Sequence, residues 1–337
     1  MLLTRLSAFG DIVHTWPLAD AIGRHPDHPE LAWLVEERFL PLVTGHPAVA
    51  RAIPVATRRW CRHPFAAATR AEICAVRRQV RAFAPDLVLD PQGLVKSALW
   101  VGATGAPRRV GLHRNVRRER LAGLFYNETV RPPDGIRHVV DINLALLSAL
   151  GMEAPFGATP DASFMRAAAL AAPAAFHGAV ALLPASAGAG KAWPAASFAA
   201  LARELIRSGR SPVVIWGPSE HALAQEICAA AGAGAMLAPP TSLAELAGLL
   251  AACSAAVGGD SGPVHLAAAL GVPTVAVFLT TDPERNGPRG PRVRIVSGAR
   301  GGATRGRART AGAAAVPVAD VLVALDTGLQ RAPDAPA

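Results

Sequence analysis

The sequence contains only four cysteines, and their positions match neither a metal site nor a disulfide framework. Cys61, Cys74, Cys228 and Cys253 do not form the paired Cys-x-x-Cys spacing of zinc and redox sites. Small secreted proteins that depend on disulfides are dense in cysteine, which this chain is not. We therefore expect a cytoplasmic protein without a cysteine-bound metal.

Long hydrophobic runs and aromatic residues are also scarce. The longest apolar stretches, 167–176 and 266–279, contain Pro173 and Pro273 and are too short to span a bilayer. Asp11 interrupts the N-terminus before the apolar core of a signal peptide. Aromatic residues make up 5% of the chain and are not interleaved with its arginines, which argues against nucleic-acid stacking. These absences predict a soluble or surface-attached chain with no nucleic-acid partner.

Lysine is nearly absent. Lys96 and Lys191 are the only lysines among 34 basic residues. In a chain where arginine has replaced lysine wherever either serves, the remaining lysines mark positions that need a compact ammonium. Chance retention is the alternative interpretation. The net charge of +9 fits an acidic partner such as a phosphate, a lipid head group or a nucleic acid, without choosing among them.

The sequence does contain a repeated alternation of short apolar runs with helical patterns. Its 51% of hydrophobic and 18% of charged residues provide a sizeable buried core. In the first half, we expect strands at 2–6, 31–35 and 86–90 and helices at 65–83 and 138–150. After an Ala-, Gly- and Pro-rich junction, we expect strands at 179–183, 212–216, 235–238, 255–258 and 274–278 and helices at 195–208, 219–231, 242–253, 262–270 and 316–329.

This alternation predicts parallel sheets joined by crossover helices. Because it occurs twice, we expect an α/β fold with two Rossmann-like, doubly wound domains. The first is expected at 1–160 and the second at 161–315, with a helix at 316–330 packing back on the first. Ligands of such sheets bind beyond the carboxyl ends of the strands, so we expect a site in a cleft between the domains.

Polar residues follow the first expected strand, in the segment 7–11. Gly10 permits a tight turn there, and Asp11 lies where the chain enters a helix. One interpretation is an aspartate that caps this helix. The other is a carboxylate that faces the cleft and takes a proton from an incoming hydroxyl.

A loop of small residues at 184–194 joins a strand to a helix in the second half, and it contains Ser186 and Lys191. Its backbone amides, the helix N-terminus and the ammonium make a candidate cradle for a diphosphate. A merely flexible loop is the alternative. The string is not a Walker motif, because it lacks the required glycine and lysine spacing.

Two further strand ends of the second half carry polar residues. They are Asp260, Ser261, Gly262 and His265 after the strand 255–258, and Glu220 after the strand 212–216. These side chains can bind ligand hydroxyls or cap helices, and a lone histidine on an Ala/Leu helix is usually structural. Arginines form two groups, at 108–120 and 285–309. Both are either solvated loops or surfaces for phosphorylated or anionic lipid.

Seven strings occur together and in order: 8–15 (AFGDIVHT), 33–37 (WLVEE), 58–60 (RRW), 90–98 (DPQGLVKSA), 124–127 (LFYN), 191–194 (KAWP) and 260–266 (DSGPVHL). Jointly they resemble glycosyltransferase family 9, the ADP-heptose:lipopolysaccharide heptosyltransferases, over about residues 1–290. The strings at 58–60 and 92–97 point to the branch that adds the first inner-core heptose. The resemblance implies a GT-B fold, with the acceptor bound mainly by the first domain and ADP-heptose by the second.

The resemblance also implies roles for individual residues. Asp11 would deprotonate a hydroxyl of Kdo on lipid A, and Lys191 would neutralise the departing ADP. The other implied donor residues are Ser186, Glu220, Asp260, Ser261, Gly262 and His265. The implied acceptor residues are Arg58, Arg59, Arg118 and His138.

By the same resemblance, L-glycero-D-manno-heptose passes with inversion from ADP-heptose to Kdo-lipid A at the cytoplasmic face of the inner membrane. Inversion needs one base, and an ammonium with helix N-termini can stabilise the leaving diphosphate without a metal or cofactor. The loop around Ser186 lacks the Thr-Thr pair usual in the family, and Ser261 replaces a threonine. The alternatives are a family 9 enzyme with another acceptor, namely a second heptose or a protein, and a non-catalytic nucleotide-sugar binding protein.

Overall fold

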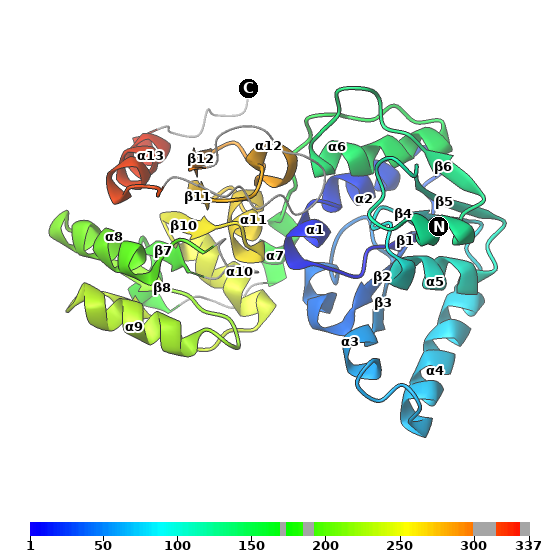
Figure 1. Cartoon of the computed structure of the whole chain (residues 1–337), viewed down its shortest axis with the longest axis horizontal. Coiled ribbons are helices and arrows are strands. Elements are labelled where there is room, and N and C mark those ends of the chain that lie inside the picture. Colours follow the sequence, from blue (N-terminus) through cyan, green and yellow to red (C-terminus); the bar gives the residue numbers. More distant parts are fainter. Residues whose placement is uncertain (169–172, 185–191, 299–314, 331–337) are drawn as a thin grey trace. The chain divides into compact units, whose positions relative to one another are not determined.

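The structure is a computed structural model that describes residues 1–168, 173–184, 192–298 and 315–330. The chain divides into two compact units, Met1–Pro160 and Asp161–Ala337. Each unit is an α/β structure built on its own sheet (Figure 1).

The first unit contains a six-stranded parallel sheet with the order β3-β2-β1-β4-β5-β6. Its strands are β1 (Leu2–Thr4), β2 (Ala32–Glu36), β3 (Arg51–Val55), β4 (Leu87–Asp90), β5 (Arg108–Leu112) and β6 (Glu128–Val130). The central strands are rich in Leu, Val and Ala and are buried throughout, as a sheet covered on both faces requires.

Helices cover both faces of this sheet. They are α1 (Phe9–Val13), α2 (Trp16–Gly23), α3 (Thr57–Trp60), α4 (Ala67–Phe83), α5 (Val95–Thr104) and α6 (Val139–Leu144), with 3₁₀ helices η1 (Glu37–Leu42), η2 (Arg120–Phe125) and η3 (Ala145–Leu150). Helices α2 and α6 pack together on one face, and α4 and α5 pack together on the other (Figure 1). The unit is therefore doubly wound.

The second unit repeats this topology. Its parallel sheet has the order β12-β11-β10-β7-β8-β9, which becomes the order of the first sheet when the strands are renumbered from β7. Its strands are β7 (Val180–Leu183), β8 (Pro212–Val214), β9 (Met236–Leu237), β10 (Ala255–Gly259), β11 (Thr274–Phe278) and β12 (Val293–Ser297). Both sheets thus have the strand order of the dinucleotide-binding Rossmann fold, which confirms the predicted fold class.

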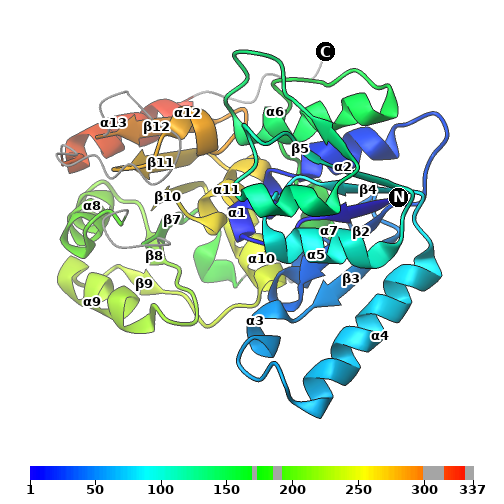
Figure 2. The same ribbon diagram turned by 45° about the vertical axis from the view of Figure 1, so that its right-hand side comes forward.

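The helices of the second unit also form two layers. They are α7 (Ser163–Ala168), α8 (Ala195–Arg207), α9 (His221–Ala231), α10 (Leu243–Ala252), α11 (Gly262–Ala269), α12 (Pro283–Asn286) and α13 (Val318–Gln330), with a 3₁₀ helix η4 (Ala174–Phe176). Helices α8, α9 and α13 lie on one face, and α10 and α11 lie on the other (Figures 1 and 2).

Helix α13 corrects one expectation. We expected residues 316–330 to pack back on the first domain, whereas α13 packs on β11 and β12 of the second sheet and against α8. The cause is the burial of apolar side chains. Val321 and Leu325 are fully buried and belong to the core of the second unit, which also contains residues of α8. The helix therefore completes the layer that covers this face of the sheet.

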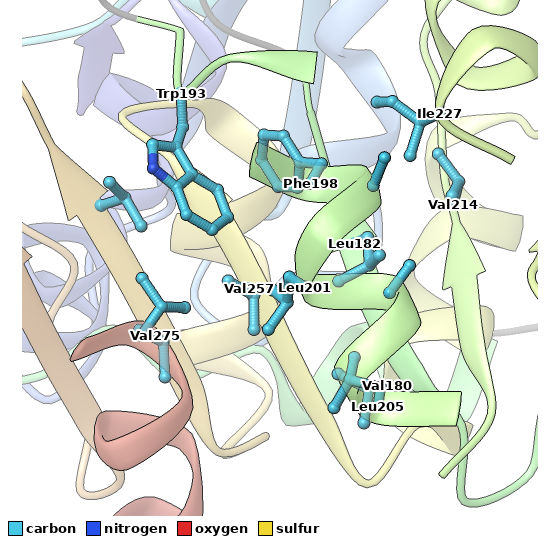
Figure 3. Close-up of a cluster of buried hydrophobic side chains, with 14 of the residues drawn as sticks. Val180, Leu182, Trp193, Phe198, Leu201, Leu205, Val214, Ile227, Val257 and Val275 are labelled. Atoms are coloured by element: carbon cyan, nitrogen blue, oxygen red, sulfur yellow. The ribbon is translucent and has the colours of Figure 1, made fainter. Parts of the chain in front are cut away.

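The core of the second unit is centred on two aromatic rings. Trp193 and Phe198 lie edge to face, with ring centroids 4.9 Å apart, above Leu201 and Val257 (Figure 3). The indole Nε1 of Trp193 donates to the carbonyl of Val316 at 3.0 Å. This hydrogen bond joins the residue just before α8 to the segment just before α13.

Four strands were not predicted, namely β3, β5, β6 and β12. Three of them lie at the edges of their sheets, where only part of a strand is buried. An edge strand has no continuous apolar run, and β3 even contains Pro54, a residue that edges tolerate. Strand β5 begins with Arg108 and Arg109, which sequence analysis assigned to an arginine-rich segment.

Candidate functional site

In the first unit, the topology places the candidate base at the point where the sheet reverses its winding. Strand β1 pairs with β2 on one side and β4 on the other, and the chain winds outward from there in both directions. Doubly wound sheets bind their ligands at this switch point, beyond the carboxyl ends of the strands. The loop after β1 leads to Asp11, and the loop after β4 contains Gln92 and Lys96.

Asp11 is the third residue of α1, and polar groups fix both of its carboxylate oxygens. Oδ1 lies 2.8 Å from a guanidinium nitrogen of Arg5, and Oδ2 accepts a hydrogen bond from the Ala8 amide at 3.1 Å. The Asp11 side chain is still 32% exposed, whereas Arg5 is buried. The carboxylate is therefore held in one orientation and remains accessible to a substrate. The N-cap residue of α1 is Ala8, so Asp11 is not the N-cap aspartate of the first interpretation; from the third position of the helix, its carboxylate accepts from the N-cap amide.

Arg5 and Gln92 join the two loops of the switch point. Arg5 also donates to the carbonyl of Pro91 at 2.9 Å, and Gln92 Oε1 accepts from the Leu6 amide at 2.7 Å. Lys96 donates its ammonium proton to Ser7 Oγ at 2.9 Å. One of the two lysines thus lies at the turn that carries the candidate base.

Below these loops lies a buried carboxylate. Asp90 Oδ1 accepts from the amides of Gln92 and Gly93, and Oδ2 accepts from the hydroxyls of Ser97 and Tyr126. Burial raises the pKa of Asp90, although these hydrogen bonds oppose the shift. Burial and the charge of Asp90 likewise raise the pKa of Tyr126. This network fixes the start of the Gln92 loop.

We predict that Tyr126→Phe destabilises the protein. The hydroxyl of Tyr126 lies 2.7 Å from Asp90 Oδ2, so its removal leaves a buried carboxylate with one donor fewer. The expected loss in the free energy of unfolding is about 1–3 kcal/mol, measured by denaturant titration. Thr129→Val also removes a hydroxyl, from an exposed position on β6, and should cost less than about 0.5 kcal/mol. Equal losses for both variants would contradict the assigned role of the network.

The four predicted acceptor residues lie in the first unit, and they differ in exposure and in their partners. Arg59 pairs with Glu37 at 3.1 Å and with Glu72 at 2.9 Å, which raises the pKa of Arg59. Arg58 and Arg118 have exposed side chains. His138 is buried at the N-cap of α6, where its Nδ1 accepts from the Val140 amide at 3.2 Å.

The structure adds one arginine that sequence analysis did not select. The guanidinium of Arg38 lies 4.3 Å from the centre of the Phe39 ring, and this ring packs 6.2 Å from that of Phe9, on the helix that carries Asp11. Burial, and then the charge of Arg58, lower the pKa of Arg38. The two guanidinium groups therefore repel each other, which an anion bound near them would relieve.

The second unit repeats the switch point between β7 and β10. Asp260 and Ser261 follow β10, and Gly262 is the first residue of α11. His265 Nε2 lies 3.8 Å from Asp260 Oδ1, and its ring is buried. Ser261 stands at the N-cap of α11, but its buried Oγ makes no hydrogen bond within the described residues. The loop thus presents a free hydroxyl beside a helix N-terminus.

A second polar strand end follows β8. Glu220 Oε2 accepts from the Gly217 amide at 2.8 Å and so closes the turn before α9. The indole of Trp216 donates to the carbonyl of Ala238 at 2.7 Å, and its ring lies 4.5 Å from that of His221. Glu220 therefore has a structural role at this turn, and its side chain is half-buried.

Ser186 and Lys191 lie outside the described residues, as does the tract 299–314. The chain on either side of the first loop is fixed. Strand β7 ends at Leu183, and Trp193 and the N-cap Pro194 are held at the start of α8. Lys191 is thus separated from a buried tryptophan by a single residue.

Comparison with known proteins identifies the family. Glycosyltransferase family 9 (heptosyltransferase) matches residues 73–315. The chain belongs to glycosyltransferase family 9. This family 9 enzyme is 34% identical to lipopolysaccharide heptosyltransferase 1 of Pseudomonas aeruginosa over 291 residues, which cover 86% of this chain and 81% of the relative. It is also 34% identical to lipopolysaccharide heptosyltransferase 1 of Salmonella typhimurium over 286 residues, or 84% and 89% of the two chains.

Solved structures agree with this assignment. Escherichia coli heptosyltransferase WaaC with ADP superposes with a TM-score of 0.82 at 30% identity, over 97% of this chain and 99% of the other. Escherichia coli ADP-heptose lps heptosyltransferase II superposes with a TM-score of 0.74 at 22% identity, over 97% and 98%. The predicted GT-B fold of the family 9 enzyme is confirmed.

Sequence analysis missed Arg5 and the network of Asp90 in the family 9 enzyme. The available signal for Arg5 was a single charge inside an expected buried strand, 2–6, and a buried charge needs a partner. The described residues contain no cluster of three His, Cys, Asp or Glu side chains placed to hold a metal ion. Among them, no helix has the length and apolar character to span a bilayer.

Proposed function

We propose that this glycosyltransferase moves L-glycero-D-manno-heptose from ADP-heptose to Kdo of Kdo-lipid A, as the first heptose of the lipopolysaccharide inner core. The observation that carries the proposal is the similarity to heptosyltransferase 1 over more than four fifths of both chains. WaaC, also solved with ADP-2-deoxy-2-fluoro heptose, provides the structural parallel for the donor, with 30% identity and a TM-score of 0.79. We assign acceptor binding to the first unit and donor binding to the second.

Asp11 is the proposed general base. It accepts the proton of the attacking Kdo hydroxyl while the oxygen forms a bond to the anomeric carbon of heptose. The bond from this carbon to the diphosphate breaks on the opposite side, and ADP leaves with its electron pair. A single carboxylate suffices because the configuration inverts and no glycosyl-enzyme is formed.

The donor site is proposed to lie around the switch point of the second unit. Lys191, Ser186 and the amides of their loop neutralise the diphosphate, so the leaving group needs no resident metal or cofactor. Asp260, Ser261, Gly262 and His265 line the heptose and phosphates, and Glu220 holds the ribose. The unpaired Ser261 hydroxyl supports this assignment, because a buried hydroxyl without a partner is costly unless a ligand binds it.

The acceptor is anionic, and the exposed guanidinium groups of the first unit suit it. Arg58 and Arg118 are proposed to bind its phosphates and carboxylates directly. Arg59 is proposed to act mainly by fixing α3, because two glutamates already engage it. His138 is proposed to border the acceptor from the N-cap of α6. Because the acceptor is anchored in a lipid bilayer, the reaction takes place at the membrane surface. We therefore propose that the enzyme attaches peripherally to the cytoplasmic face of the inner membrane.

A panel of acceptors tests the proposal. Purified enzyme with ADP-heptose is expected to add one heptosyl residue to Kdo-lipid A and to release an equal amount of ADP, both measured by mass spectrometry. Kdo-lipid A that already carries a heptose, and an unrelated protein, are the comparison acceptors. Preference for either would assign a sister activity of family 9. If the protein binds ADP-heptose but forms no product with any acceptor, it is a non-catalytic nucleotide-sugar binding protein.

A further inference from the structure

The surface formed by α5 and η2 in the first unit carries three exposed leucines. Leu99 on α5 is 54% exposed, and Leu121 and Leu124 on η2 are 66% and 80% exposed. We call these three residues the leucine patch. Large apolar side chains exposed next to one another mark contact surfaces more often than isolated ones do.

Two contacts fix α5 and η2 side by side. The Val95 amide donates to Glu119 Oε2 at 2.7 Å at their first residues, and the Phe125 ring packs over Gly102 near their last. A Cβ at Gly102 would lie only 2.7 Å from this ring, so the two elements are in close contact. Leu99 lies between the two contacts, beside the segment of η2 that carries the other two leucines.

The 3₁₀ geometry of η2 explains why Leu121 and Leu124 point the same way. Residues three apart are eclipsed in a helix with three residues per turn. Ala122 and Phe125, on the other side of η2, are buried or half-buried against the unit. Short helix η2 therefore carries apolar side chains on its outer face as well as on the face that packs on the unit.

Exposed cationic side chains precede the leucines of η2 in the chain. Arg118 and Arg120 flank Glu119, Arg114 precedes them, and all three arginines have exposed side chains. Within the described residues none of the three forms an ion pair with a carboxylate, and Glu119 accepts from the Val95 amide. Arg117 does not contribute, because its guanidinium donates to the carbonyls of Leu112 and Arg120.

We propose that the leucine patch is the surface by which this enzyme docks on an anionic lipid bilayer. The leucines enter the interfacial region, and Arg114 and Arg120 contact the head-group phosphates. Apolar side chains together with basic ones are what stable peripheral attachment needs, since neither alone holds a protein at a membrane. A protein partner or a second copy would have to provide carboxylates around an apolar centre, whereas anionic lipid provides both features.

The position of the patch fits the chemistry of the same unit. The Glu119 amide donates to the carbonyl of Gly93 at 3.1 Å, and Gln92 beside it accepts from the Leu6 amide at 2.7 Å, close to the loop of Asp11. The patch is thus connected by two hydrogen bonds to the switch point of the first sheet. The docking role of the leucine patch rests on the proposed function, because a docked patch would bring the base to a lipid-anchored acceptor.

Vesicle binding of the full chain tests the proposal. Vesicles of phosphatidylethanolamine and phosphatidylglycerol are sedimented with the wild-type enzyme, with Leu121→Ser/Leu124→Ser and with Arg120→Gln. We expect the double serine variant to lose about tenfold or more in partitioning, and Arg120→Gln about fivefold. Neutral phosphatidylcholine vesicles should bind the wild type weakly. Val323→Ser, at an exposed position of α13 in the second unit, is the matched control and should bind like the wild type.

A gain of binding provides a second measurement that does not depend on lost affinity. Leu124→Trp should bind anionic vesicles at least as well as the wild type, and brominated lipids should quench its added fluorescence. Val323→Trp should not be quenched. Unchanged binding of Leu121→Ser/Leu124→Ser, or no quenching of Leu124→Trp, would overturn the proposal. So would concentration-dependent dimers that these serines abolish, because the patch would then be an interface between copies.

Failure of the proposed function is distinguishable from failure of this inference. Vesicle binding needs neither ADP-heptose nor Kdo, so it is measured whatever the reaction proves to be. If the reaction is as proposed, Leu121→Ser/Leu124→Ser should turn over a water-soluble, delipidated Kdo acceptor at the wild-type rate. The same variant should then be slower only with the vesicle-embedded acceptor.

Discussion

Asp11→Asn is expected to lower kcat by about 10²–10⁴-fold, which is the contribution of a well-placed general base. Asparagine keeps the size of the side chain, and its amide oxygen still accepts the hydrogen bond from the Ala8 amide. It cannot accept a proton from the acceptor hydroxyl. The affinity for ADP, measured by calorimetry, should stay within about twofold, because we assign nucleotide binding to the other unit.

The control for this variant is Asp27→Asn, an equal change at an exposed aspartate that lies outside the switch point. It should leave kcat unchanged. Arg5→Met complements the test, since Arg5 orients Asp11 and would not touch substrate. It should lower kcat with little change in the KM for the donor, and Arg5→Lys should restore part of the loss. Near-normal turnover of Asp11→Asn would show that another group is the base.

The topology explains why residues so far apart in sequence define the candidate sites. In each unit the first strand, β1 or β7, pairs with the fourth, β4 or β10, and the sheet winds in opposite directions from this pair. The polar loops follow these strands in both units. At the switch point, the loops that follow the two neighbouring strands lead to opposite faces of the sheet. A crevice is left between them, in which backbone amides and side chains can contact a ligand.

Sequence analysis predicted the fold where burial is complete on both faces of a strand. The segments 31–35 and 274–278 are apolar except for Thr274, because parallel strands covered by helices have no polar face. It failed at the edges, where β3 and β12 are only partly buried. It also misplaced the packing of α13, because the apolar face of a helix does not specify which sheet it covers.

The candidate site could be predicted only in part, for a similar reason. Asp11 and Gly262 follow strands and sit where helices begin, and this pattern is visible in the sequence. The ion pair of Arg5 with Asp11 is not, because it joins the end of a strand to a helix through a turn whose shape no periodicity encodes. The pairing of Arg59 with two glutamates was missed because Glu72 is thirteen residues away on another helix.

Lys191→Ala is expected to lower kcat/KM for ADP-heptose by about 10²–10³-fold, the usual cost of removing one group that stabilises a developing charge. Lys191 is one of only two lysines among the 34 basic residues of the chain. The other lysine, Lys96, donates to Ser7 Oγ at 2.9 Å beside the candidate base, so one of the two retained ammonium groups does occupy a switch-point loop. Retention of lysine at a functional position is therefore not unique to Lys191.

The arginine variant separates charge from shape. Lys191→Arg keeps the positive charge but replaces a compact ammonium by a planar fork, and it should recover less than about tenfold of the activity lost in Lys191→Ala. Lys96→Ala is the matched control: it should leave the affinity for ADP unchanged, whereas Lys191→Ala should weaken it. Equal ADP affinities for Lys191→Ala and the wild type would remove Lys191 from the donor site and assign the diphosphate to the amides of α8 and α11 alone.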